Sequence, residues 1–154
     1  MKRTRSLLPF VIAALVLAGG AVFVRSVPAA PAVSVAKVSV AVGKSNYGQI
    51  LFDGRGFALY AFTQDPDGKA TCKGQCAKKW PPYFVSGRPS AGRGAKASLL
   101  GTTRRSDGKL QATYAGRPLY YYVGDTSPGI VLCQNVVEFG GTWLVLRGNG
   151  ILVR

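Results

Sequence analysis

Apolar residues alternate with small or polar residues along much of the chain beyond residue 32. Valine alternates with small or polar residues within 33–42, and short apolar runs recur at 47–52, 57–62, 110–114 and 119–123. A period of two is typical of β strands, whose side chains point to opposite faces in turn. No stretch beyond residue 32 repeats apolar residues at i, i+3, i+4 and i+7 over three helical turns. We therefore predict a mainly β domain.

Glycine-containing turns separate these runs. Asp53–Gly56 lies between two apolar runs, and this is a strong hairpin signal because glycine accepts positive φ without steric cost. Ser106–Lys109 makes a similar turn before the run at 110–114. Around Arg147–Gly150 the sequence predicts a closing hairpin of residues 143–146 and 151–153.

One ten-residue phrase occurs twice, 60 residues apart. Gly56–Asp65 and Gly116–Asp125 both read Gly-x-x-Leu-Tyr-x-aromatic-x-x-Asp. Self-similarity at a fixed offset indicates a repeat architecture. We predict two tandem related β repeats that form one small pseudo-symmetric sandwich or barrel. The expected parts are a signal peptide or N-terminal membrane anchor (1–32), a lead-in strand or tether (33–46), a first repeat (47–86), a flexible basic loop (87–98) and a second repeat (99–154).

The N-terminus has the pattern of an export signal. Lys2, Arg3 and Arg5 precede the apolar stretch 7–24, and small residues follow at 28–32. A run of 18 residues is also just long enough to span a bilayer, so an uncleaved anchor is the alternative. Both interpretations place the domain outside the cytoplasm, either secreted or in the cell envelope.

The chain is strongly basic. Beyond residue 32 it holds 16 Lys and Arg residues against 6 Asp and Glu, a net charge of +10. Outside the cytoplasm the available polyanions are phospholipid head groups, phosphate-bearing wall polymers and acidic glycans. We expect anionic envelope polymers or another envelope protein as partners, no nucleic acid, and a membrane only through an uncleaved N-terminal segment. The simpler alternative is that the charge serves solubility alone.

The aromatic residues of the repeated phrase share strand faces. Tyr60 and Phe62 point the same way, as do Tyr120 and Tyr122, because strand side chains alternate. These four rings form either the shared core or the lining of a cleft in which rings stack on a ligand.

The two aspartates that end the phrase are the polar candidates. Asp65 opens Asp-Pro-Asp-Gly, a type I turn sequence, and Asp125 opens a second turn, so both carboxylates can cap backbone N–H groups. The alternative pairs them across the pseudo-twofold axis as cation ligands or as general acid and base. The candidate ligand-binding residues are Tyr60, Phe62, Asp65, Tyr120, Tyr122 and Asp125.

The chain has three cysteines. In an exported protein Cys72 and Cys76 favour a short-loop disulfide. Cys133 makes the number odd, so one thiol stays free, pairs with another chain or takes part in exchange. A 72–133 or 76–133 bridge between the repeats is the competing arrangement. Neighbouring lysines, among them Lys73, would lower the pKa of a nearby thiol and so favour its thiolate. A redox role and a purely structural disulfide are therefore both open.

Absent residues narrow the chemistry. The sequence has no histidine and no Gly-rich phosphate loop, and its one methionine is Met1. Histidine-based triads, histidine-containing zinc sites and Cys-x-x-Cys-His haem attachment are therefore excluded. A hydrolase is not expected, and we predict no catalytic residue, metal ligand or cofactor.

The motifs together resemble a known family. The doubled Tyr-x-aromatic-x-x-Asp, the segment Cys72–Ala77 and the following Trp-Pro-Pro are similar to a bacterial family of secreted repeat proteins and predicted lipoproteins characterised by that tyrosine–aspartate motif. The resemblance runs from Gln49 to Leu146 and implies an envelope location and a β-rich repeat. Two features depart from the family: no lipid-attachment cysteine follows the signal, and Cys133 is additional to the Cys-x-x-x-Cys pattern.

Two functional hypotheses follow. The first is a non-enzymatic secreted or cell-envelope repeat domain that binds an envelope ligand or partner through an aromatic and basic surface. The alternative is an extracytoplasmic thiol–disulfide or other redox protein that uses Cys72, Cys76 and Cys133.

Overall fold

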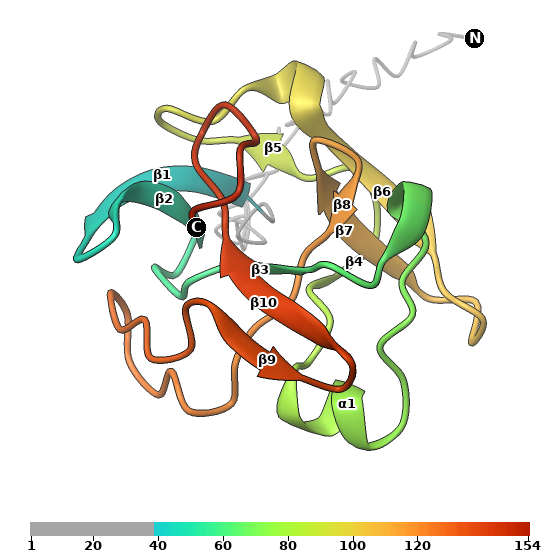
Figure 1. Ribbon diagram of the computed structural model, residues 1–154. Helices are drawn as coiled ribbons and strands as arrows, with labels where there is room; N and C mark the ends of the chain where they lie inside the picture. Colours follow the sequence, from blue (N-terminus) through green and yellow to red (C-terminus); the bar gives the residue numbers. More distant parts are fainter. Residues whose placement is uncertain (1–38) are drawn as a thin grey trace, which may run out of the picture. The chain divides into compact units, whose positions relative to one another are not determined.

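The computed structural model describes residues 39–154, and the predictions for 1–32 and for the start of the lead-in strand lie outside these residues (Figure 1). Short strands dominate, joined by one α-helix and two 3₁₀-helices. Within residues 39–154 no helix is long and apolar enough to cross a membrane. The elements are β1 (Ser39–Ser45), β2 (Gly48–Asp53), β3 (Tyr60–Phe62), η1 (Pro66–Gly68), α1 (Gln75–Lys79), β4 (Phe84–Val85), β5 (Ser90–Ala91), η2 (Ala97–Leu99), β6 (Leu100–Arg104), β7 (Leu110–Tyr114), β8 (Arg117–Pro118), β9 (Val136–Glu138) and β10 (Gly141–Val145).

The strands form three small sheets. Their orders are β2-β1-β5, β3-β10-β9 and β4-β7-β6, with β8 added to β7. All described pairs are antiparallel except β1 with β5, which is parallel. The mainly β class and the two related repeats predicted from the sequence are confirmed.

Each repeat begins with the same hairpin. β1 pairs with β2, with Val40 opposite Asp53, and β6 pairs with β7, with Leu100 opposite Tyr114. β1 is thus the counterpart of β6 and belongs to the first repeat, although the sequence suggested a lead-in strand or tether over 33–46. Period-two alternation identified the strand but could not show which strand it would pair with.

The turns predicted around glycine are present. Gly56 donates its backbone N–H to the Asp53 carbonyl at 2.9 Å and has φ +90°, a conformation that glycine adopts without strain. At the C-terminal hairpin, the Arg147 N–H donates to the Ile151 carbonyl at 2.9 Å, and Leu146 bridges Leu152. Local turn chemistry therefore decided both hairpins.

The two repeats exchange their last segments. β3 of the first repeat pairs with β10 of the second, with Phe62 opposite Trp143. The equivalent strand of the second repeat lies along residues 80–82 of the first, with Tyr120 bridging Pro82 and the Tyr121 N–H donating to the Pro81 carbonyl at 2.8 Å. Each repeat is therefore completed by backbone from the other.

A stack of four rings lies at the centre of this exchange. Trp80 and Trp143 stack with centroids 4.0 Å apart and planes 2° apart. Phe62 stacks on the outer face of Trp143 at 4.2 Å, and Tyr122 lies against Trp80 at 4.8 Å. Both tryptophans are fully buried. Aromatic pairs of this kind contribute about 0.5–1.5 kcal/mol each beyond the area that they bury, so the stack holds the repeats together.

The basic segment 87–98, predicted as a flexible loop, contains regular structure. β5 pairs with β1, with Ser90 opposite Ser39, and η2 follows at Ala97–Leu99. The short α1 was also not predicted, because five residues give too few turns for an apolar periodicity to show. Backbone pairing, rather than apolar burial, orders β5.

The exchange predicts that neither half folds alone. Fragments 39–98 and 99–154, produced separately, should give collapsed amide spectra in two-dimensional NMR, because each lacks the strand that covers its half of the ring stack. An equimolar mixture should recover the dispersed spectrum of the intact domain. A dispersed spectrum from either fragment by itself would contradict the exchange.

Candidate functional site

The repeated phrases meet at their tyrosines. Tyr60 and Tyr120 exchange two backbone hydrogen bonds, each 2.9 Å from nitrogen to oxygen. Their side chains then cross to the opposite repeat: the Tyr60 hydroxyl donates to Asp125 Oδ2 at 2.6 Å, and the Tyr120 hydroxyl donates to Asp65 Oδ2 at 2.7 Å. The sequence predicted these four residues as a group but not the crossed pairing.

The second carboxylate oxygen of each aspartate holds a loop. Asp65 Oδ1 accepts the Thr71 backbone N–H at 2.8 Å and the Thr71 hydroxyl at 2.7 Å. Asp125 Oδ1 accepts the Leu132 backbone N–H at 3.0 Å. The carboxylates do bind backbone N–H groups, but these lie six and seven residues downstream rather than in the turn that follows directly.

Burial favours the core interpretation of the candidate residues. Tyr60 and Tyr120 are fully buried, and Phe62 is 4% exposed. The two aspartates are 8% and 5% exposed, so their oxygens face protein donors rather than solvent. Of the six candidates, only Tyr122 is half-buried. A ligand could stack on the buried rings only if the core opened.

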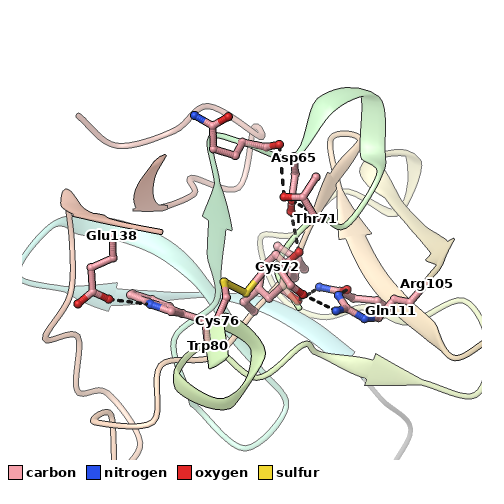
Figure 2. Close-up of a disulfide and its surroundings, with 11 residues drawn as sticks. Asp65, Thr71, Cys72, Cys76, Trp80, Arg105, Gln111 and Glu138 are labelled. Atoms are coloured by element: carbon pink, nitrogen blue, oxygen red, sulfur yellow. Dashed lines mark hydrogen bonds between the residues drawn. A yellow bond between two sulfur atoms is a disulfide. The ribbon is translucent and has the colours of Figure 1, made fainter. Parts of the chain in front are cut away.

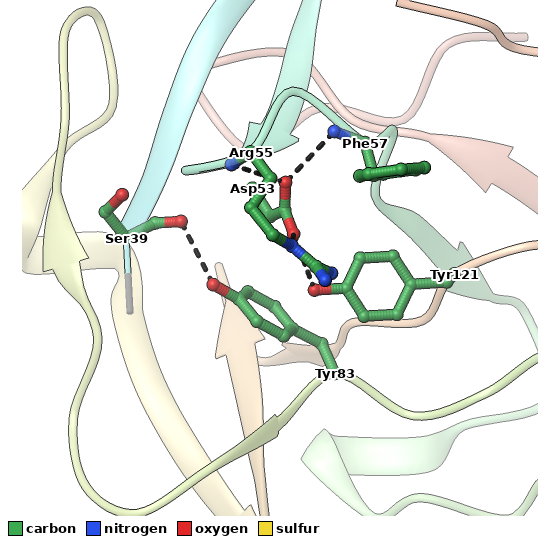
Figure 3. A network of polar contacts seen from close by, with 6 residues as sticks. All are labelled: Ser39, Asp53, Arg55, Phe57, Tyr83 and Tyr121. Atoms are coloured by element: carbon green, nitrogen blue, oxygen red, sulfur yellow. Dashed lines mark hydrogen bonds and ion pairs between the residues drawn. The ribbon is translucent and has the colours of Figure 1, made fainter. Parts of the chain in front are cut away.

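A third tyrosine–aspartate contact was missed by sequence reasoning (Figure 3). The Tyr121 hydroxyl donates to Asp53 Oδ2 at 3.0 Å, and Asp53 is 4% exposed. The same carboxylate accepts the backbone N–H groups of Arg55 and Phe57 and pairs with the Arg55 guanidinium at 2.9 Å. The Asp-Gly turn gave no sign of this long-range partner, because the turn chemistry alone accounts for an aspartate there.

Burial and the carboxylates control tyrosine ionisation. Burial, and secondarily the hydrogen bond to Asp125, raises the pKa of Tyr60 far above its usual value. Burial and Asp65 raise the pKa of Tyr120 in the same way, and burial and Asp53 raise that of Tyr121. Burial also raises the pKa of Asp125, opposed by the hydrogen bonds that it accepts.

The disulfide joins Cys72 to Cys76, the first of the pairings considered from the sequence (Figure 2). Both cysteines are buried, at 2% and 7% exposed. The Cys72 carbonyl accepts a hydrogen bond from Arg105, which is itself 8% exposed and also donates to Gln111 Oε1 at 2.6 Å. This buried guanidinium, whose described partners are neutral, is a further residue that the sequence did not identify.

Cys133 is free and half-buried. It occupies the place in the second repeat that Cys72 holds in the first, because each follows the residue whose N–H binds the repeat's aspartate. The interaction with Cys133, followed by burial, raises the pKa of Tyr122. No group of three or more His, Cys, Asp or Glu side chains that could hold a metal ion occurs within residues 39–154.

The two tryptophans differ in their polar partners. Trp80 Nε1 donates to Glu138 Oε2 at 3.1 Å, and Glu138 also pairs with Lys79. Trp143 Nε1 is buried without a hydrogen-bond partner among the described residues. The two central rings of the stack therefore differ in their polar contacts.

Charge is sorted between the interior and the surface. Residues 39–154 hold 15 Lys and Arg against 6 Asp and Glu. Of the carboxylates whose side chains are described, three are buried and two lie in ion pairs with Lys79 and Lys109. All but three of the basic residues are exposed; the exceptions are Lys79, Arg105 and Arg117. The surface is therefore more basic than the composition alone indicates.

The chain matches a family described as a secreted repeat of unknown function, over residues 41–83 and 101–147. These two matches cover more than half of the sequence, so the chain belongs to this family. The family resemblance stated from the sequence is thus confirmed, and an extracytoplasmic location agrees with the description of the family as secreted. No curated protein and no solved structure matches the chain.

Removing one tyrosine hydroxyl should destabilise the domain. Tyr60→Phe leaves a buried oxygen of Asp125 without its donor, so we expect the free energy of unfolding to fall by about 1.5–3 kcal/mol. Guanidinium unfolding followed by tryptophan fluorescence measures this change. The control is Tyr122→Phe. Because the Tyr122 ring is half-buried, we expect the loss of its hydroxyl to lower the free energy of unfolding by less than about 1 kcal/mol. Equal losses in the two variants would contradict the role of the crossed pairs.

Stability should fall steeply in alkali. Tyrosine in the unfolded chain loses its proton near pH 10, whereas Tyr60, Tyr120 and Tyr121 keep theirs in the folded state. Their contribution is complete below about pH 10 and is lost as pH rises, at up to about 1.4 kcal/mol per pH unit for each ring. Guanidinium unfolding between pH 8 and 11 tests this. Tyr60→Phe should show a shallower decline, and an unchanged slope would refute the assignment.

Proposed function

We propose that this chain is a non-enzymatic repeat domain that binds an anionic ligand of the cell envelope through its basic surface. Family membership makes it a secreted repeat protein. The observation that supports binding is the sorting of charge: the carboxylates whose side chains are described are buried or lie in ion pairs, while most of the cations are exposed. Surface potential of one sign attracts polyanions and concentrates them near the protein.

The internal carboxylates give this arrangement a physical cause. Asp53, Asp65 and Asp125 each accept a tyrosine hydroxyl and at least one backbone N–H group. Asp65 and Asp125 cannot turn outward to neutralise surface cations without breaking these contacts, and among residues 39–154 Asp53 pairs only with the neighbouring Arg55. The interlocked repeats thus act as a rigid support that presents unneutralised lysine and arginine side chains.

The aromatic residues of the proposed surface are not the ones that the sequence suggested. The rings of the repeated phrase are mostly buried, whereas Phe84 and Phe139 are 43% and 48% exposed. Lys109 Nζ lies 5.2 Å from the centroid of the Phe84 ring, a cation–π contact at the surface. These rings would supply apolar contact beside the cations.

The redox alternative has less support in the geometry. A thiolate must reach a sulfur of the disulfide for exchange, and Cys72 and Cys76 are both buried. A hollow of about 430 Å³ borders the disulfide, between Phe62 and Phe139, but its described walls include no third cysteine. A structural bridge that closes the loop before Trp80 accounts for the pair.

Salt-sensitive retention on envelope material tests the proposed function. The exported protein should sediment with isolated cell envelopes at low ionic strength, and about 0.5 M salt should release it, because salt screens exposed charges. Val123→Ala, at an exposed side chain outside the proposed surface, serves as a control that keeps every charge, and we expect it to bind within about threefold of the parent. Absence of sedimentation at low salt, or retention that salt does not change, would overturn the proposal.

A further inference from the structure

A groove beside the turn of the first hairpin gathers cations that lack acidic partners. The β1–β2 turn and the segment after β5 enclose a hollow of about 480 Å³. Among its lining residues are Lys44, Ser45, Gly48, Gln49, Arg93 and Gly94.

Backbone pairing fixes the two walls of this groove. The Gly92 N–H donates to the Val40 carbonyl, and the Val42 N–H donates to the Arg93 carbonyl, both at 2.8 Å. These bonds extend the parallel contact of β5 with β1 as far as Arg93. Lys44, two residues beyond Val42 on β1, is thereby held on the wall next to Arg93.

A third cation reaches the groove from the C-terminal hairpin. Arg147 Nη1 would lie 3.1 Å from a Cβ placed on Gly48, so the guanidinium extends over that glycine. The loop that carries it is anchored, because the Tyr114 hydroxyl donates to the Gly148 carbonyl at 2.6 Å. In Figure 1 the dark red 147–150 loop and the yellow-green loop after β5 lie at the same end of the domain.

These three side chains are unneutralised. Lys44, Arg93 and Arg147 are exposed, and the ion pairs among residues 39–154 involve other cations. Lys44 and Arg93 line the hollow, and Arg147 reaches Gly48 at its edge. One ammonium group and two guanidinium groups in this arrangement are suited to phosphate oxygens. Gly48 and Gly94 contribute backbone to the lining, and at Gly94 a Cβ would lie only 2.8 Å from Val42 Cβ.

We propose that this groove binds the phosphodiester groups of a linear anionic polymer, which deepens the proposed function and rests on it. The lining includes no aromatic ring, so stacking on sugar rings does not determine recognition. None of the large exposed apolar side chains of residues 39–154 lines the groove, although Ile151 lies on the hairpin that carries Arg147, so insertion into a lipid bilayer is not favoured there. Repeated charge along a flexible chain matches three cations contributed by three separate segments.

Binding of a poly(glycerol phosphate) chain to the exported protein, measured by isothermal titration calorimetry, tests this site. The variant Lys44→Gln/Arg93→Gln/Arg147→Gln should bind about 10- to 100-fold more weakly and show a smaller dependence of affinity on salt. The matched control Lys69→Gln/Lys73→Gln/Lys78→Gln removes the same charge from exposed residues of the segment from the end of η1 to α1, away from these loops in Figure 1. It should stay within about threefold of the parent. Circular dichroism confirms that both variants fold.

The other outcomes would overturn the groove, its ligand or the proposed function. Equal losses in the two variants would show diffuse attraction and overturn the groove while leaving the proposed function intact. Equal or tighter binding to phosphatidylglycerol vesicles, or to alginate as a carboxylate polymer, would overturn the phosphodiester polymer as ligand. If the parent protein binds envelopes but not poly(glycerol phosphate), the phosphodiester polymer is also overturned as ligand. A parent that binds neither would overturn the proposed function as well.

Discussion

The fold depends on the crossed contact between two tyrosines and two aspartates. A buried carboxylate is costly unless it accepts hydrogen bonds, and here each one is satisfied by the tyrosine of the opposite repeat and by a loop of its own repeat. Neither repeat can therefore satisfy its own aspartate. The reciprocal backbone bonds between Tyr60 and Tyr120 place both hydroxyls at once, so the electrostatic requirement and the chain topology support each other.

The ring stack also requires both repeats, in this case to bury apolar surface. Trp80 is covered by Tyr122 and Trp143 by Phe62, so in both cases a strand from one repeat covers the tryptophan of the other. Each repeat is too small to form a large core by itself. Together the two repeats form one domain around the shared ring stack. This arrangement suits short chains, which bury too little surface to be stable as separate units.

The repeats have diverged at sites that the shared core does not fix. Cys72 is bonded to Cys76, whereas its counterpart Cys133 is free. The fully buried position of Ile50 on β2 is occupied on β7 by Gln111, which accepts from the buried Arg105. A buried guanidinium needs acceptors, and Gln111 of the second repeat and the carbonyl of Cys72 of the first repeat supply them.

The sequence by itself determined the strand content, the glycine turns, the repeat and the family, because all of these are local patterns or direct self-similarity. It also grouped Tyr60, Asp65, Tyr120 and Asp125, and it included 72–76 among the cysteine pairings that it left open. Only the tertiary structure decided that the repeats exchange strands, that the aspartates bind tyrosines across the domain, and that Arg147 reaches Gly48 beside the groove lined by Lys44 and Arg93. Period-two alternation shows which face of a strand is buried but not which strand lies beside it. That choice is made by long-range pairing, where the cost of burying polar groups is met by partners 55 and 65 residues away.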